Sequence, residues 1–237
     1  MVGTQCVILA GGLGTRLGPL AAATPKALVP VGGAPFVDHQ LRWLASHGVD
    51  AIVFCIGHFG GQLRAHVGDG RRFGLGVRYV DEGEDLRGTA GALRLALDEH
   101  ALAEQFLVTY GDSYLPVDFG AMARAFDRSS APAMMSVYRN EGRWDKSNAS
   151  VQGGRVSLYD KRRRDGEPRM EYIDYGLLAF RREVVESRIL LGTRGDLAEL
   201  LHDLSVEGQL AAYEVGTRFY EVGSKEGLAD LENFLLT

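Results

Sequence analysis

Apolar runs alternate with amphipathic stretches through the first part of the chain. Short runs of mainly apolar residues predict buried strands over residues 6–10, 51–56 and 76–80. Between these runs, apolar positions recur at helical spacing over residues 35–47 and 61–67. A strand and helix repeat of this kind is typical of a parallel sheet that is covered by helices on both faces. The hydrophobic pattern therefore predicts an α/β fold.

The later part of the chain is less regular, since a polar, turn-rich stretch over residues 140–148 interrupts the alternation. We expect the remaining elements to be strands over residues 105–109, 133–139, 171–180 and 210–215, a hairpin over 151–159, and helices over 197–207 and 225–234. The chain has 237 residues and no linker-like stretch, so it is predicted to form a single domain over residues 1–237.

A glycine-rich loop directly follows the first predicted strand. The apolar run Cys6-Val7-Ile8-Leu9-Ala10 leads into Gly11-Gly12-Leu13-Gly14-Thr15-Arg16-Leu17-Gly18. Backbone N–H groups of such a loop can approach an anion closely, because glycine has no side chain to block the approach. Arg16 adds a planar set of donors suited to phosphate oxygens, and Lys26 adds a mobile positive charge. These residues predict a phosphate-binding loop beyond the carboxyl end of a strand, where ligands of such sheets bind.

The loop fits two other nucleotide-binding patterns less well. A Walker A loop needs Lys-Ser or Lys-Thr after its last glycine, and this loop has no lysine there. The dinucleotide-binding fingerprint needs a glycine where Leu17 stands, although Gly12, Gly14 and Gly18 form a looser variant of it. A dehydrogenase therefore stays open as a distant alternative, together with an ordinary strand-to-helix turn that is rich in glycine.

A longer string of residues resembles a known family. Residues 9–17 and 25–33 are similar to the signature of sugar-1-phosphate nucleotidyltransferases, and further resemblances follow in family order at residues 88–92, 111–112 and 221–224. The resemblance implies a three-layer α/β/α fold with a Rossmann-like, mixed and mostly parallel sheet of the GT-A type. Within the family, the length of the chain and residues 68–75 are similar to short bacterial enzymes without a C-terminal hexapeptide-repeat domain.

The resemblance also implies which residues bind the nucleotide. Arg16 and Lys26 are expected to be catalytic, through the charge that they place on the phosphates. The expected nucleotide-binding residues are Leu9, Ala10, Gly11, Gly12, Gly14, Thr15, Glu82, Gly88 and Thr89. The chain departs from the family pattern by one extra residue, Arg87, before Gly88.

Two carboxylates are expected to bind Mg²⁺. Asp112 follows the strand predicted over residues 105–109, where an acid can hold the ion between phosphates. Capping of the turn before residues 118–127 is the alternative role for Asp112. The resemblance implies a second metal ligand at Glu221, where the family normally has aspartate, and loss of this metal contact is the alternative.

The sugar phosphate is expected to meet a third set of residues. The resemblance implies that Lys161 reaches the phosphate, while the three arginines after it are read as a solvated face. The other expected sugar-side residues are Asn148, Glu171, Asp174 and Gly176. Asp174 and Tyr175 depart from the family pattern, as does the pair Ser147-Asn148, so the sugar is expected to be an unusual one. Exposed strand ends are the alternative reading of Glu171 and Asp174.

The composition of the chain bears on its binding partners and on its place in the cell. The net charge of −5 argues against a surface that coats nucleic acid. No apolar run has the length of a membrane span, and residues 1–10 do not resemble a signal peptide, so a cytoplasmic protein without a membrane partner is expected. Cys6 and Cys55 both lie in apolar runs, which predicts neither a disulfide framework nor a zinc site. A monomer and a homo-oligomer are equally compatible with the sequence.

The resemblance implies transfer of a nucleoside monophosphate from an NTP to a sugar 1-phosphate, with release of pyrophosphate. The attacking phosphate oxygen is already ionised, so no general base is required, and the sequence offers no Ser-His-Asp or Cys-His arrangement. GTP with a heptose or mannose-type 1-phosphate is the preferred pair. A uridylyltransferase acting on N-acetylmuramate 1-phosphate or another sugar phosphate stays open. A non-catalytic nucleotide-binding or sensory protein is the alternative from another class.

Overall fold

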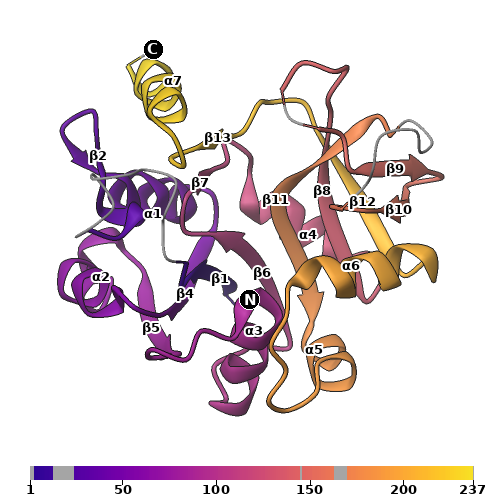
Figure 1. Cartoon of the computed structure of the whole chain (residues 1–237), viewed down its shortest axis with the longest axis horizontal. Coiled ribbons are helices and arrows are strands. Elements are labelled where there is room, and N and C mark those ends of the chain that lie inside the picture. The colour runs from indigo at the N-terminus through magenta and orange to yellow at the C-terminus, as the bar shows by residue number, and fades with distance from the viewer. Residues whose placement is uncertain (1–2, 13–23, 145, 163–169, 237) are drawn as a thin grey trace.

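The centre of the molecule is a nine-stranded sheet (Figure 1). The computed structural model describes residues 3–12, 24–144, 146–162 and 170–236. In spatial order the strands are β5 (Gly76–Asp81), β4 (Val49–Ile56), β1 (Thr4–Ala10), β6 (Gln105–Tyr110), β11 (Tyr172–Arg181), β8 (Ala133–Arg139), β12 (Leu210–Val215), β10 (Arg155–Tyr159) and β9 (Ala149–Gln152). The first four strands pair in parallel, whereas β11 is antiparallel to both β6 and β8. The predicted mixed, mostly parallel sheet is confirmed.

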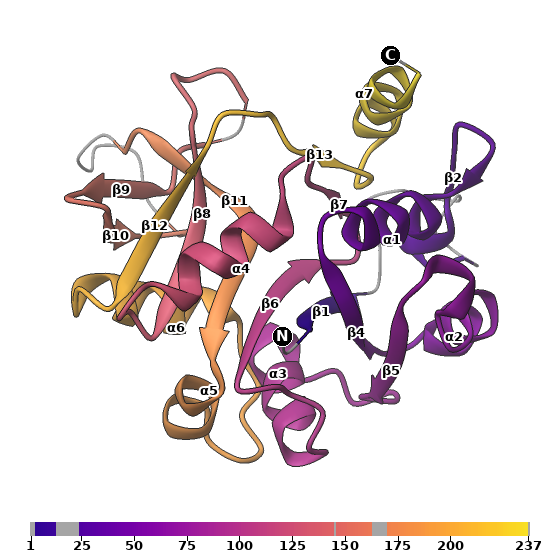
Figure 2. The ribbon, with the colours of Figure 1, turned by 180° about the vertical axis from the view of Figure 1, so that it is seen from behind.

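Helices cover both faces of the sheet (Figures 1 and 2). On one side lie α1 (Phe36–Ser46), α2 (Gly60–Val67) and α4 (Phe119–Asp127), and on the other lie α3 (Gly88–Asp98), α5 (Arg182–Arg188) and α6 (Leu197–Val206). Cys6 and Ile8 of β1 pack in the core on the first side, while Val7 and Leu9 pack in the core on the second. Side chains of a strand point alternately to opposite faces, which explains this division. The three-layer α/β/α architecture is therefore confirmed.

After β12, the chain crosses back to the half of the molecule that holds β1. There β13 (Tyr220–Glu221) pairs antiparallel with β7 (Ser113–Tyr114), and α7 (Lys225–Leu235) follows (Figure 2). The helix packs beside the hairpin of β2 (Pro30–Val31) and β3 (Ala34–Pro35), where buried Leu231 joins a core with Val31 and Phe36. The C-terminal segment thereby adjoins the turn that follows β6.

Most predicted elements are found close to their expected positions. The hairpin predicted over residues 151–159 is formed by β9 and β10, with Gly153 and Gly154 at positive φ in the turn. The hydrophobic pattern did not delimit α3, α4 and α5, nor the short 3-10 helices η2 (Lys26–Leu28) and η3 (Arg71–Phe73). In α3 the buried face consists largely of glycine and alanine, so its amphipathic signal is weak.

The core contains both cysteines of the chain as free thiols. Cys6 lies in β1 and Cys55 lies in the adjacent strand β4, and both side chains are fully buried. Burial raises the pKa of both thiols, so they behave as small hydrophobic residues. Among the helices that the structure describes, none combines the length and the apolar character that a bilayer crossing requires.

Candidate functional site

A cavity of about 350 Å³ lies at the carboxyl ends of β1, β4 and β6. Parallel strands end at one edge of a sheet, so the loops that follow them meet there. The predicted site residues that line this cavity are Leu9, Ala10, Gly11, Gly12, Lys26, Glu82, Gly88, Thr89 and Asp112. Gly14, Thr15 and Arg16 lie outside the described residues. Residues that are distant in the sequence therefore line one cavity.

An ion pair between Lys26 and Asp112 forms one end of the cavity. The Lys26 Nζ atom lies 2.7 Å from Asp112 Oδ2, and the two side chains are 14% and 30% exposed. Lys26 begins the 3-10 helix η2, whose residue Ala27 is buried in the core. A cation this well shielded acts on a bound phosphate with less screening than a surface lysine does. The pair thus joins the expected catalytic lysine to the expected metal ligand.

The position of Asp112 depends on a buried glutamine of α1. Gln40 donates from Nε2 to the backbone oxygens of Tyr110 (2.8 Å) and Ser113 (2.9 Å), so it holds the turn on both sides of Asp112. The Gly111 N–H also donates to the Leu9 oxygen at 2.9 Å. The sequence reasoning missed Gln40, although an amide on the apolar face of a predicted helix is a signal of a buried hydrogen-bonding role.

Replacement of Gln40 by leucine is expected to lower the free energy of unfolding by about 2 kcal/mol, because two buried carbonyl oxygens lose their donor. Denaturant titration of the variant measures this loss. Gln152→Leu changes an exposed glutamine of β9 and should alter stability by less than about 0.5 kcal/mol. Equal stability of Gln40→Leu and the wild type would contradict the role assigned to the amide.

Glu221 lies on β13, whose partner strand β7 begins directly after Asp112. The Cα atoms of Glu221 and Ser113 are paired across the two strands. The next residue, Val222, donates its N–H to the backbone oxygen of Asp112 at 2.9 Å. A Cβ on Gly223 would lie 4.0 Å from Lys26 Nζ, so this segment also reaches the lysine. The structure thus brings the backbone of Glu221 close to that of Asp112, although only Asp112 of the two lines the cavity.

The donor set at this end suits magnesium bound together with phosphates. Within the described part of the chain there is no cluster of three or more histidine, cysteine, aspartate or glutamate side chains that could hold a metal alone. Magnesium is commonly held by one or two carboxylates, while water and substrate phosphates supply its other oxygens. Asp112 and Glu221 therefore fit the group, provided that a phosphate ligand completes the site.

Glu82 lines the same cavity and directly follows strand β5. Its side chain is buried, and Oε1 accepts from the Arg87 N–H at 2.9 Å. Oε2 lies against Gly11, where an added Cβ would be only 2.6 Å away, so a side chain at position 11 would displace the Glu82 carboxylate. Burial raises the pKa of Glu82, and the hydrogen bond from the Arg87 N–H opposes this rise only in part. The extra residue Arg87 thus serves the loop through its backbone.

The N-terminus of α3 is packed tightly against the segment before α6. Gly88 has a φ of +75°, and a Cβ there would lie 2.5 Å from the Gly195 oxygen. The Ala90 N–H donates to that same oxygen at 3.0 Å. Any side chain at position 88 would collide with this backbone, so the glycine permits the contact that places Thr89 on the cavity wall.

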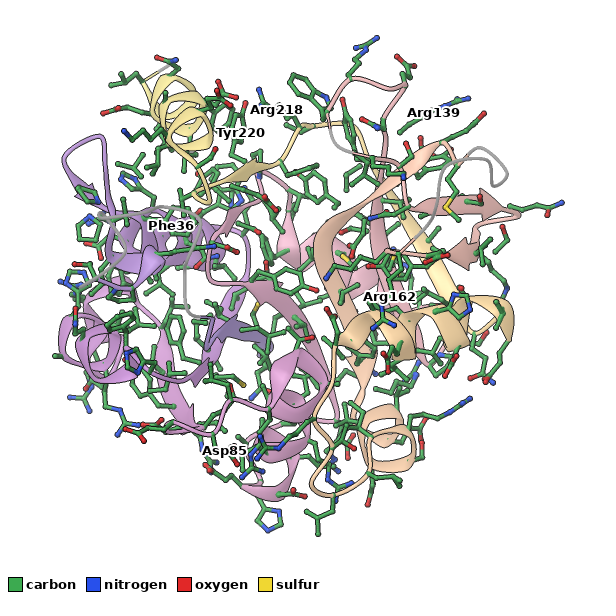
Figure 3. The ribbon with its side chains drawn as sticks, in the orientation of Figure 1. Phe36, Asp85, Arg139, Arg162, Arg218 and Tyr220 are labelled. Carbon is green, nitrogen blue, oxygen red and sulfur yellow. The ribbon has the colours of Figure 1, made fainter. Side chains whose placement is uncertain are left out.

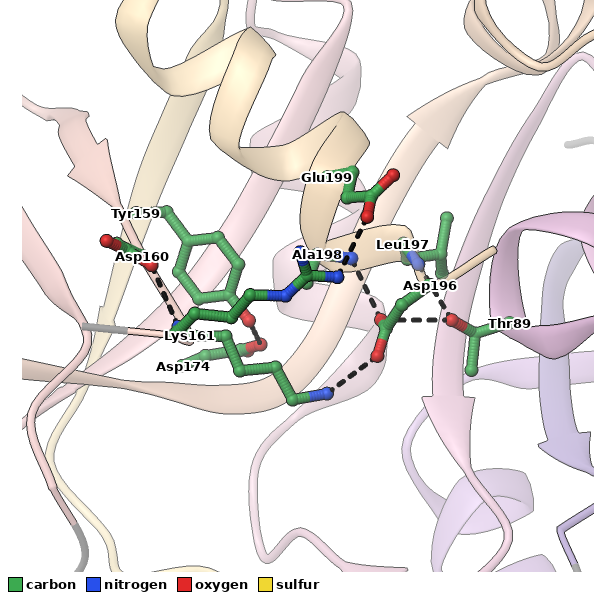
Figure 4. Close-up of polar contacts among 10 residues, drawn as sticks. Thr89, Tyr159, Asp160, Lys161, Asp174, Asp196, Leu197, Ala198 and Glu199 are labelled. Atoms are coloured by element: carbon green, nitrogen blue, oxygen red, sulfur yellow. Dashed lines mark hydrogen bonds and ion pairs between the residues drawn. The ribbon is translucent and has the colours of Figure 1, made fainter. Parts of the chain in front are cut away.

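The expected sugar-side residues, apart from Glu171, gather beside the cavity without lining it. The Asp174 N–H donates to Asn148 Oδ1 at 2.8 Å, and the Gly176 N–H donates to Asp174 Oδ1 at 3.0 Å. Tyr159 donates its hydroxyl to Asp174 Oδ2 at 3.4 Å, and the Lys161 side chain beside them reaches Asp196 (Figure 4). These contacts order Asp174, Asn148 and Gly176 into one polar cluster.

Glu171 lies apart from this cluster. Its side chain is 59% exposed and pairs at 3.3 Å with Arg139, which Figure 3 labels at the outer margin of the molecule. This position corresponds to the exposed strand end that the sequence left open as an alternative. Glu171 does not line the cavity, and its expected sugar-binding role stays a prediction.

The acidity of Asp174 predicts a pH dependence of stability. Burial raises the pKa of Asp174 to about 6, although the Gly176 N–H and the charge of Lys161 oppose this rise. The folded state then holds the proton more tightly than the unfolded chain does. The stability that Asp174 contributes is therefore complete below about pH 4 and is lost as the pH rises through about 6.

We expect the Tm of Asp174→Asn, relative to wild type, to rise between about pH 4 and pH 7, since only the wild type must ionise a buried acid. Thermal unfolding of both proteins across this range measures the effect. A difference in Tm that does not vary with pH would contradict the assignment of this titration to Asp174.

The chain is similar in sequence to a known protein family and to several named proteins. A family model described as "Nucleotidyl transferase" matches residues 5–148. A Sulfolobus acidocaldarius protein provisionally named mannose-1-phosphate guanyltransferase is 30% identical over 186 residues, which cover 76% of this chain and 49% of that protein. The N-acetylmuramate alpha-1-phosphate uridylyltransferase of Neisseria meningitidis is 34% identical over 134 residues, or 56% and 57% of the two chains. The chain spans about half the length of these curated relatives.

A solved structure shares the fold over almost the whole chain. It is a Bacillus anthracis protein provisionally named glucose-1-phosphate thymidylyltransferase, solved with sucrose, and its TM-score is 0.83 at 22% identity. The superposition covers 98% of this chain and 94% of that one. The agreement extends over the sheet, its covering helices and the C-terminal crossing.

Proposed function

The chain belongs to the nucleotidyl transferase family, and from that membership we propose that it transfers a nucleoside monophosphate from an NTP to a sugar 1-phosphate, releasing pyrophosphate. One observation carries the proposal: the partly buried Lys26 and Asp112 meet at 2.7 Å in a cavity that is also lined by the glycine-rich strand end. A lysine and an acid in contact offer a cation for phosphate and a ligand for magnesium. Both are needed when two polyanions react.

The chemistry proposed for this cavity is positioning and charge neutralisation. The attacking oxygen of a sugar phosphate is already an anion, so the protein must hold it in line with the α-phosphorus and offset the growing charge. Lys26 would stabilise the α-phosphate, and Arg16 with the loop of Gly11, Gly12, Gly14 and Thr15 would hold the triphosphate. Lys161 would steer the sugar phosphate. Asp112 and Glu221 would hold Mg²⁺, whose charge would offset that of the phosphates.

We propose GTP as the nucleotide and a heptose or mannose-type sugar 1-phosphate as the acceptor. The Watson–Crick edge of guanine presents two adjacent donors, which suit a carboxylate acceptor such as Glu82 beside Gly11. The Sulfolobus relative named for mannose-1-phosphate and guanylyl transfer supports this pair. A uridylyltransferase acting on N-acetylmuramate 1-phosphate is the second candidate, because the Neisseria relative carries that name.

A substrate panel tests the proposal. Each of GTP, UTP, dTTP, CTP and ATP is combined with a set of sugar 1-phosphates in the presence of Mg²⁺, and pyrophosphate release is measured. We expect turnover with GTP and a mannose-type or heptose phosphate, and loss of turnover when the metal is chelated. Preference for UTP with N-acetylmuramate 1-phosphate would favour the second candidate. Tight nucleotide binding without pyrophosphate release from any pair would reject transfer and favour a non-catalytic nucleotide-binding protein.

A further inference from the structure

We propose that Asp196 is a positioning residue that holds Lys161 against the nucleotide side of the cavity. Asp196 lies at the N-terminus of α6, and the sequence analysis assigned it no role. This inference rests on the proposed function, in which Lys161 binds the sugar phosphate. Lys161 follows strand β10, in the other half of the sheet from the cavity. Its contact with Asp196 would place it beside the nucleotide.

The two oxygens of Asp196 face in different directions (Figure 4). Oδ2 accepts from Lys161 Nζ at 3.0 Å, while Oδ1 accepts from the Thr89 hydroxyl at 3.2 Å and from the Ala198 N–H at 2.9 Å. Thr89 lines the cavity near the N-terminus of α3. A single carboxylate therefore connects a cavity-wall residue to the lysine of the sugar side.

The backbone around Asp196 is fixed to the same wall. The Gly195 N–H donates to the Arg87 oxygen at 3.0 Å, and the Gly195 oxygen accepts from the Ala90 N–H at 3.0 Å. The Leu197 N–H donates to Thr89 Oγ1 at 2.8 Å. Asp196 is thus held between two residues that are anchored to α3, and its position is determined by the nucleotide side of the molecule.

Asp196 keeps its charge in this setting. Burial by itself would raise the pKa of Asp196, but hydrogen bonds from the Ala198 N–H and Lys161 outweigh it, so the pKa is lowered. An ionised acceptor makes a stronger hydrogen bond to an ammonium group than a neutral one does. The ion pair with Lys161 is therefore present throughout the neutral pH range.

The neighbouring ion pair, between Arg162 and Glu199, has no such connection to the cavity wall among the described residues. Arg162 pairs with Glu199 at 2.8 Å, one turn further along α6, and the side chains are 78% and 66% exposed. The corresponding fractions for Lys161 and Asp196 are 55% and 41%. An exposed pair contributes little. Glu199 therefore offers a matched control on the same helix.

The central variant is Asp196→Asn, which removes the charge that holds Lys161 but keeps an oxygen for Thr89 and the helix cap. With the NTP and sugar phosphate that the wild type accepts, we expect kcat/KM for the sugar phosphate to fall about tenfold. KM for the NTP should change less than about twofold, because the nucleotide contacts stay in place. Glu199→Gln should leave both constants within about twofold of wild type, and thermal unfolding shows whether either variant is destabilised.

A double-mutant cycle decides whether Asp196 acts through Lys161. In a Lys161→Ala background, Asp196→Asn should have no further effect on kcat/KM for the sugar phosphate. Additive losses, or a fall in Tm with equal damage to both substrates, would overturn the positioning role and leave the transferase proposal intact. A wild type without turnover on the whole panel would instead overturn the transferase proposal. The two failures are therefore distinguishable.

A second measurement does not depend on turnover. The rate at which an acylating reagent modifies Lys161 is followed by mass spectrometry in the wild type and both variants. Loss of the ion pair frees the amine, so the rate at Lys161 should rise severalfold in Asp196→Asn and stay unchanged in Glu199→Gln. Equal rates in all three proteins would overturn the link between Asp196 and Lys161.

Discussion

Replacement of Lys26 by methionine is expected to lower kcat about 10³-fold, which is the scale of losing one preorganised group that stabilises transition-state charge. The Nζ atom is the charged group at the Asp112 end of the cavity, and its side chain is only 14% exposed. Methionine has a similar length and keeps the packing around Ala27, so the charge is the main loss. Pyrophosphate release with the accepted substrate pair measures the effect.

Two comparisons separate charge from structure in this experiment. Lys225→Met alters an exposed lysine in the first turn of α7 and should leave kcat within about twofold of wild type. Lys26→Arg keeps the charge but replaces a compact ammonium group with a wider planar one, so we expect partial recovery only. A methionine variant that retains more than about a tenth of wild-type kcat would exclude Lys26 from the reaction.

Replacement of Asp112 by asparagine is expected to lower kcat/KM by about 10²- to 10³-fold and to raise the Mg²⁺ concentration needed for half-maximal activity. The change removes one negative charge while keeping the size of the side chain. It also ends the 2.7 Å ion pair with Lys26, which then loses its described partner in this cavity. Activity measured across a Mg²⁺ titration tests both expectations at once.

A second aspartate provides the matched control for this experiment. Asp118 caps α4 by accepting from the Ala121 N–H at 2.8 Å, and it lies outside the cavity lining. Asp118→Asn should leave both the rate and its Mg²⁺ dependence near the wild-type values, since asparagine is also a good helix cap. If Asp112→Asn and Asp118→Asn behave alike in the titration, Asp112 is not a metal ligand.

The sequence by itself determined the layered fold and one wall of the site, because both are encoded by local patterns. In β1 the apolar run predicts burial on both faces, and Gly11 and Gly12 follow it directly. Asp112 was placed at the end of β6 by the same argument from strand to loop. Parallel strands that end at one edge bring such loops together without any knowledge of long-range contacts. Lys26 was singled out by its charge after the glycine-rich loop, whereas the resemblance supplied Glu82 and Thr89, and the structure brings all three to this edge.

Only the tertiary structure decided how those residues are held and which neighbours they have. Gln40 supports the turn around Asp112 from α1, and Asp196 joins Thr89 to Lys161 from α6. Helical spacing signals the burial of Gln40, but the partners of Gln40 and of Asp196 leave no periodic trace, because each contact joins groups from distant parts of the chain. Glu171 shows the converse, since a polar residue at a strand end can face the solvent instead of the site. Hydrophobic periodicity determines which face of an element is buried, whereas the partners of a buried polar group are set by the packing of whole elements.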